Sequence, residues 1–337
     1  MKKYLLTGIV LSTLLMFSAC KKTESVSPLT DGNPINSGRI GLPGGGNFCL
    51  GDLTNFLFVF ADGSTDANWQ GATKGFMGNV AVNGITANER TSGGVPYAGY
   101  LFTNDGSAGS WQNILNQNSS QSAGVYGENV RIDGLTTELN NAFSTINAMQ
   151  VTFDYEAVSA SSLNGLNVQN GVTEVYVINI TSGMQVSSKI NITGDATDIF
   201  ILRWDSDANP TNGYQGTVKF QSGGGIVPHG GLRPSNFVHV AGNISSSGGG
   251  SNPAAPYPQG PRYDDGLGDL ITNGSNFNGG GFFTGYWLTT GDPVSHQTSS
   301  LSNAIFVGGW YTTSVKFSMT SGTSGVYVSP PTGLTCE

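Results

Sequence analysis

The sequence feature that most constrains the fold is a short alternating pattern closed by glycine. Two β-branched residues flank a third residue, one more residue follows, and Gly ends the pattern, at Val80–Gly84, Val130–Gly134, Val238–Gly242 and Ile305–Gly309. In a strand, this alternation places the two β-branched side chains on one face and the middle residue on the other. We therefore expect the β-branched side chains to point into a core, and the middle residues Arg131 and His239 to point away from it.

Repetition of such short strands favours a solenoid. Strand-like runs at Glu174–Ile180, Gln185–Ile192 and Asp198–Trp204 lie close together, and no two-residue Asn-Gly hairpin joins them. The chain has 50 Gly and only 11% charged residues, which is typical of an extracellular all-β protein with many tight turns. A sandwich or a barrel is also compatible with these strands, but the missing hairpins favour the coils of a parallel β-helix.

One segment has helical periodicity instead. Between Leu135 and Gln150, six apolar residues fall on one helical stripe: Leu135, Leu139, Ala142, Phe143, Ile146 and Met149. Asp133 is placed to cap the N-terminus of this helix. A single amphipathic helix among strands must bury its stripe on a sheet, so we predict a helix that flanks the solenoid.

The N-terminus has the pattern of an exported lipoprotein. Two lysines precede an apolar run from Tyr4 to Phe17, and Ser18 and Ala19 lead into Cys20. Residues 1–19 therefore resemble a lipoprotein signal peptide, with Cys20 as the lipidated first residue of the mature chain. The polar, Gly- and Pro-rich residues 20–46 predict a lipid anchor with a flexible linker, and residues 47–337 form one domain. We expect the protein to be exported and lipid-anchored to the outer membrane, on the cell surface.

Two further cysteines remain, Cys49 near the start of the domain and Cys336 near its end. An oxidising compartment permits them to form a disulfide that ties the two ends of the domain together. Two buried free thiols are the alternative.

The segments Leu50–Phe60 and Gly78–Gly84 resemble the opening of "choice-of-anchor A" adhesin domains. Those domains begin with an aromatic-rich strand followed by a Val- and Gly-rich rung, and they carry one helix. The resemblance covers about residues 48 to 330, and it implies a right-handed parallel β-helix with a flanking helix, displayed on the cell surface. Asn83-Gly84 replaces the usual Gly-Gly pair. Ice-binding β-helix domains share this architecture and remain an alternative.

Candidate sites for chemistry are few. The spacing of Asp205, Asp207 and Asn209 is compatible with a calcium loop, although an acidic turn explains the same residues. The three histidines, His229, His239 and His296, have no metal-ligand spacing, and no nucleophile motif occurs. We therefore expect no enzyme and no cofactor other than calcium.

Aromatic residues offer a candidate binding surface. Tyr286, Trp287, Trp310 and Tyr311 lie among Gly and Thr residues. Exposed, they would stack on sugar rings or contact a protein partner; buried, they would be large core residues of the solenoid.

These features predict a non-catalytic, adhesin-like surface protein that binds a glycan, matrix protein or other surface ligand. One alternative is an ice-binding protein, which needs Thr, Ser and small residues at the same place on successive rungs, a recurrence that is not visible in the sequence. A second alternative is a polysaccharide-active β-helix enzyme. The net charge of −8 argues against nucleic acid as a partner.

Overall fold

The computed structural model describes residues 40–41, 47–61, 66–69, 76–83, 90–91, 97–104, 122–127, 129–152, 158–207, 213–247, 281–291, 299–301, 304–313, 316–319, 324–326 and 334. All of them belong to one compact unit, Ile35–Glu337. The predicted leader, Cys20 and most of the predicted linker lie outside the described residues. Their boundaries and the lipid anchor therefore stay predictions.

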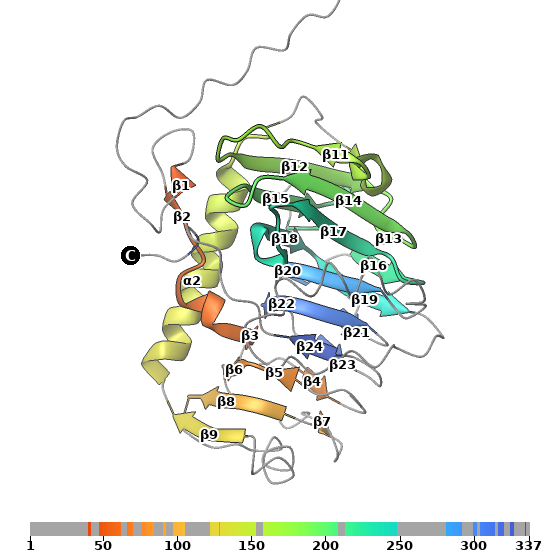
Figure 1. Ribbon diagram of the computed structural model, residues 1–337. Coiled ribbons are helices and arrows are strands. Elements are labelled where there is room, and N and C mark those ends of the chain that lie inside the picture. The colour runs from red at the N-terminus through yellow and green to blue at the C-terminus, as the bar shows by residue number, and fades with distance from the viewer. Residues whose placement is uncertain are drawn as a thin grey trace, which may run out of the picture. The chain divides into compact units, whose positions relative to one another are not determined.

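Most of the described strands form one fifteen-stranded sheet that wraps around two sides of a solenoid (Figure 1). Its strands are β3 (Phe56–Phe60), β5 (Phe76–Met77), β6 (Asn79–Val82), β8 (Tyr97–Thr103), β9 (Ser122–Gly127), β10 (Val158–Ser159), β11 (Leu166–Asn167), β12 (Val175–Ser182), β14 (Lys189–Gly194), β15 (Ile199–Trp204), β17 (Gly225–Gly230), β18 (Phe237–Ala241), β20 (Phe282–Thr289), β22 (Ile305–Thr312) and β24 (Ser324–Val326).

A separate seven-stranded sheet forms the remaining side. Its strands, in spatial order, are β13 (Gln185–Val186), β16 (Thr217–Gln221), β19 (Asn243–Ser247), β21 (Ser299–Leu301), β23 (Lys316–Met319), β4 (Asp66–Trp69) and β7 (Arg90–Thr91). All pairings in both sheets are parallel, for example β12 with β15 and β16 with β19. The predicted all-β parallel β-helix with one flanking helix is confirmed.

The only antiparallel pair among the described strands joins β1 (Ile40–Gly41) to β2 (Asn47–Phe48). Strand β1 therefore lies inside the segment that was predicted to be a linker. Three short 3-10 helices complete the described elements: η1 (Gly51–Asn55), η3 (Ala160–Leu163) and η5 (Pro234–Asn236).

The coils do not follow one another in sequence order along the solenoid. The C-terminal strand β22 pairs with the N-terminal strand β3, with Trp310 opposite Phe58, and β23 pairs with β4, with Ser318 opposite Asn68. The chain therefore builds the coils of β3 to β9 first and then the coils from β10 onward. The last of these return to pack on the first (Figure 1).

The flanking helix is α2 (Asn129–Ala148), which follows β9 and precedes β10 in the chain and lies along one side of the strands (Figure 1). The six residues of its predicted apolar stripe are all buried, which confirms that stripe. The predicted start is wrong, because Asp133 lies exposed within the helix and not at its cap. Val130–Gly134 is accordingly helical and not a rung of the solenoid. The Arg131 guanidinium lies over the rings of Phe56 and Phe102, at 5.3 and 5.0 Å from their centres.

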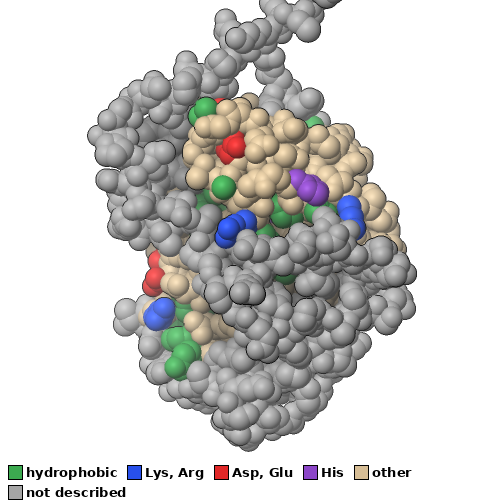
Figure 2. Space-filling view, in the orientation of Figure 1, with side chains coloured by type: hydrophobic (Ala, Val, Ile, Leu, Met, Phe, Trp, Pro, Cys, Tyr) green, Lys and Arg blue, Asp and Glu red, His purple; other side chains and the backbone are tan. Residues whose placement is uncertain are grey.

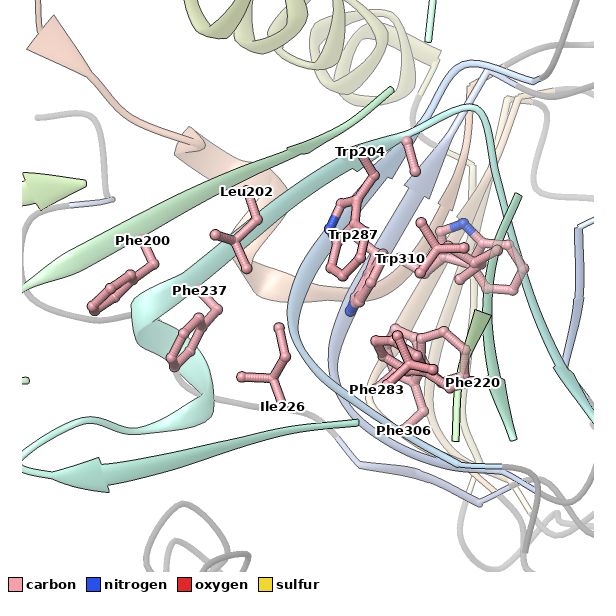
Figure 3. Close-up of a cluster of buried hydrophobic side chains, with 14 of the residues drawn as sticks. Phe200, Leu202, Trp204, Phe220, Ile226, Phe237, Phe283, Trp287, Phe306 and Trp310 are labelled. Carbon is pink, nitrogen blue, oxygen red and sulfur yellow. The ribbon is translucent and has the colours of Figure 1, made fainter. Parts of the chain in front are cut away.

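A column of aromatic side chains fills the solenoid interior (Figure 3). Phe200 stacks on Phe237 at 5.1 Å, and Phe283 stacks on Phe306 at 5.8 Å between ring centres. Such rings bury large apolar areas between successive coils. The expectation that valines and isoleucines form the core is therefore only partly right.

His239 in strand β18 illustrates why the expectation of a Val and Ile core is only partly right. Its ring lies inside the aromatic column, parallel to the Trp287 ring at 3.9 Å, while Val238 and Val240 belong to the cluster that packs against α2. The prediction that His239 points away from the interior is wrong. Strand β18 is buried on both sides, so alternation alone does not identify which side is the solenoid interior.

The two ends of the domain meet. Leu50 N–H donates to the Leu334 carbonyl at 2.7 Å, and both side chains are buried. Cys49 is disulfide-bonded. Its predicted partner Cys336 lies outside the described residues, so this pairing stays a prediction that the Leu50–Leu334 contact favours. In the described part of the chain, no helix has the length and apolarity needed to cross a membrane.

Candidate ligand-binding face

Only part of the solenoid surface is available to a ligand. Helix α2 covers the side formed by strands such as β3, β15 and β18, whose residues are buried throughout. On the second side of the fifteen-stranded sheet, Val227, Phe282 and Thr284 are at most 1% exposed, whereas β14 leaves Lys189, Asn191 and Thr193 partly exposed. Among the described residues away from α2, both β14 and the seven-stranded sheet therefore present strand residues to solvent.

The seven-stranded sheet alternates between core and surface. In β16, Val218 and Phe220 are fully buried, whereas Thr217, Lys219 and Gln221 are partly exposed. Strand β19 continues the pattern with Ser245 and Ser247 partly exposed. The Ser247 hydroxyl donates to the Gln221 side-chain oxygen of the neighbouring rung at 3.3 Å, so polar groups connect along the outer side.

One register position of this sheet runs through all seven strands. We call it the central row; it consists of Gln185, Lys219, Ser245, Ser300, Ser318, Asn68 and Arg90, each opposite the next. Parallel strands are about 4.8 Å apart, so the row repeats at that interval. Three serines and an asparagine therefore occupy the same position on four successive rungs. The expectation that Thr does not recur in the same place on successive rungs is wrong, because Thr289 in β20 lies opposite Thr312 in β22.

The four aromatic residues predicted as a ligand surface are not on the surface. Tyr286, Trp287, Trp310 and Tyr311 are all 0% exposed. The Trp287 and Trp310 indoles belong to the interior column (Figure 3). The two tyrosines belong to the second cluster, which includes the buried residues of α2. Their interpretation as ligand contacts is wrong, and their alternative interpretation as core residues is correct.

The predicted calcium residues do not come together as a described site. Asp205 is 3% exposed, and its Oδ1 accepts the backbone N–H groups of Gln215 at 3.0 Å and Asp207 at 3.4 Å. Burial raises the pKa of the Asp205 carboxyl. This carboxylate therefore closes a turn, while Asn209 lies outside the described residues and the calcium loop stays a prediction. Within the described ranges, no group of three or more His, Cys, Asp or Glu residues is placed to hold a metal ion.

A second acidic group lies at a corner of the solenoid. The Asp198 carboxylate accepts the backbone N–H groups of Glu174 at 3.0 Å and Asp195 at 2.7 Å. Asp195 in turn accepts the N–H groups of Asn170 and Gly171, and these bonds lower the pKa of its carboxyl. The carboxylates thus satisfy backbone donors of the turns, which is a structural role.

Histidine does not supply a site either. His229 Nε2 lies 2.8 Å from the Asn191 side-chain oxygen on the neighbouring rung. His239 is enclosed, and its Nδ1 accepts the Trp204 indole N–H at 3.1 Å. His296 lies outside the described residues. The described surface in Figure 2 is accordingly mostly uncharged and polar, with only scattered charged and apolar side chains.

The sequence matches no protein-family model and no curated protein. The resemblance to choice-of-anchor A domains therefore has no support from a family model. Several solved structures that resemble the chain are ice-binding proteins. One comes from an Antarctic biological consortium (13% identity, TM-score 0.44, 83% of this chain and 90% of the other). A second is the DUF3494 domain of an ice-binding protein from Shewanella frigidimarina (12% identity, TM-score 0.44, 83% of this chain and 96% of the other). A third comes from the Antarctic ascomycete Antarctomyces psychrotrophicus (11% identity, TM-score 0.45, 83% of this chain and 98% of the other).

Proposed function

We propose that this protein is a non-catalytic ice-binding protein and that the seven-stranded sheet is the face that contacts ice. The observation that carries the proposal is the recurrence of Ser245, Ser300, Ser318 and Asn68 on successive rungs of the central row. Serine and asparagine are small, uncharged residues that can both donate and accept hydrogen bonds. Held at a constant interval by the rigid solenoid, they form a repeating polar array that suits a repeating ligand.

Ice fits this array better than a glycan does. Sugar rings are commonly bound by exposed aromatic side chains, and the four candidates for that role are enclosed in the cores. The partly exposed residues of β16 and β19 include no aromatic side chain. The alternative of an adhesin for glycan or matrix therefore loses the sequence feature that favoured it.

A non-enzymatic role agrees with the same geometry. The carboxylates of Asp195, Asp198 and Asp205 accept backbone N–H groups at turns. Arg131, the only basic residue on a predicted rung, stacks on two phenylalanine rings at the helix. These described groups support the fold, and their roles in it differ from those of the acid–base pair that glycoside hydrolysis requires.

The test is thermal hysteresis of the purified protein. We expect the wild type to separate the melting and freezing temperatures of ice, and Ser245→Tyr to abolish most of that effect, because a tyrosine would protrude from the row. Ser144→Tyr on the exposed side of α2 is the matched control and should keep full activity. Circular dichroism must show that both variants are folded.

A wild-type protein without thermal hysteresis or inhibition of ice recrystallisation would contradict the proposal. In that case, binding to a glycan and matrix-protein array would favour the adhesin. Equal loss of activity in the Ser245 and Ser144 variants would contradict the assignment of the ice-binding face to the seven-stranded sheet.

We also propose that the chain is exported and anchored by a lipid on Cys20, from the leader that precedes this residue. Mass spectrometry of the mature protein tests this. A mature N-terminus at Cys20 with an acyl modification is the expected result, and an N-terminus elsewhere would contradict it.

A further inference from the structure

The central row changes character on both sides of its four small polar residues. Lys219 occupies the next position beyond Ser245, and Arg90 occupies the next position beyond Asn68. Lys219 is partly exposed, and it lies between the buried Val218 and Phe220 in β16. Its side chain therefore points to the outer side of the sheet, as that of the partly exposed Ser245 on the next rung does.

A lysine is poorly suited to contact with a crystal of water. Its ammonium is a compact, strongly hydrated charge on a flexible four-carbon stem. Fixing that stem against a rigid surface removes most of its rotamer freedom. Ice offers no opposite charge in return. A lysine in the row therefore holds mobile water where the adjacent serines would order it.

We propose that Lys219 is a boundary residue of the ice-binding face, which limits the contacting row to the four positions Ser245, Ser300, Ser318 and Asn68. The inference rests on the proposed function. Lys219 then sets the extent of the face at one end of the central row, and its removal should increase the activity.

The experiment compares thermal hysteresis of wild type, Lys219→Ser and Lys189→Ser at equal protein concentration. Lys189 is the matched control, because it is also a partly exposed strand lysine but lies in β14 of the fifteen-stranded sheet. Both changes remove one positive charge. We expect Lys219→Ser to raise the hysteresis by about 1.25-fold or more, which is the ratio of five row positions to four. Lys189→Ser should leave it unchanged.

Three outcomes separate this inference from the proposed function. Inactive wild-type protein refutes ice binding itself. Active wild-type protein with unchanged or lower hysteresis in Lys219→Ser overturns the boundary role, and a lower value would show that the lysine contributes to binding. An equal gain in both variants also overturns it, because net charge would then be the cause. Lys219→Thr, which keeps a strand-forming residue, repeats the test if the serine variant is unstable.

Discussion

Arg203 of strand β15 connects the solenoid to the C-terminal end of helix α2 by a hydrogen bond to the Met149 carbonyl. Arg203 Nη1 donates to this carbonyl at 3.0 Å and to the Ile146 carbonyl at 3.2 Å. On its other side, Nε donates to the Asn179 side-chain oxygen of the neighbouring rung at 2.7 Å. A cation at the C-terminus of a helix also complements the helix dipole. Strand β15 therefore supplies the groups that the last turn of α2 lacks.

Replacing this arginine should destabilise the domain. In Arg203→Met, three hydrogen bonds from a buried charged group are lost and helix carbonyls lose their donors. We expect a loss of about 2–3 kcal/mol in the free energy of unfolding. Urea denaturation followed by circular dichroism measures it. Arg203→Lys keeps the charge but not the forked geometry and should recover only part of the loss, whereas two variants as stable as wild type would contradict this role.

Sequence patterns predicted the solenoid and the helix stripe, because both depend on local periodicity. They did not predict which side of β18 is the interior, since that strand is covered by the core on one side and by α2 on the other. For that reason, the prediction from the sequence that His239 points away from the core is wrong. The central row was also hidden, because Ser318 and Asn68 lie opposite each other across β23 and β4 although 250 residues separate them in sequence. Only the return of the C-terminal coils onto the N-terminal ones creates this neighbour relation.

Two glycines on neighbouring rungs are required by close backbone contact. Gly308 in β22, which has a φ of +148°, lies opposite Gly285 in β20. A Cβ at Gly308 would lie only 1.8 Å from the Gly285 carbonyl oxygen. Gly308→Ala must therefore push the two coils apart. We expect a loss of about 3 kcal/mol or more, measured as a lower midpoint of urea denaturation.

Gly134→Ala is the control for that change. Gly134 lies in α2, and a Cβ there meets nothing within 4 Å. Alanine is the better helix former by about 1 kcal/mol, so this variant should be more stable than wild type. Similar effects of the two substitutions would contradict the close contact at Gly308.

Ser222 should be replaceable with a gain in stability. It follows β16 and is the only non-glycine residue with positive φ, +53°, in the described ranges. A side chain in this left-handed conformation is strained, and glycine relieves the strain. We expect Ser222→Gly to stabilise the domain by about 0.5 kcal/mol, after allowing for the greater freedom of glycine in the unfolded chain. Thermal unfolding measures the change. Ser187→Gly, at an exposed position without positive φ, should be slightly destabilising.

His239 should make stability depend on pH below neutrality. Burial lowers the pKa of its imidazole to about 3, whereas the group titrates near 6.5 in an unfolded chain. The ring contacts Trp204, Phe237 and Trp287, none of which carries a charge, and the favourable effect of the Thr284 backbone on the charged imidazole is smaller than the effect of burial. Between these two pKa values, the unfolded state binds a proton that the folded state does not. Stability is therefore fully present above about pH 6.5 and falls as the pH decreases, by about 1.4 kcal/mol per unit.

The comparison of wild type with His239→Phe isolates this contribution. The variant keeps an aromatic ring in the column but cannot take up a proton. We expect the stability difference between the two proteins to change by about 1.4 kcal/mol for each unit between pH 6 and pH 4, as measured by urea denaturation. If wild type and His239→Phe lose stability in parallel over that range, His239 is not held neutral in the core, and the acid sensitivity comes from other groups.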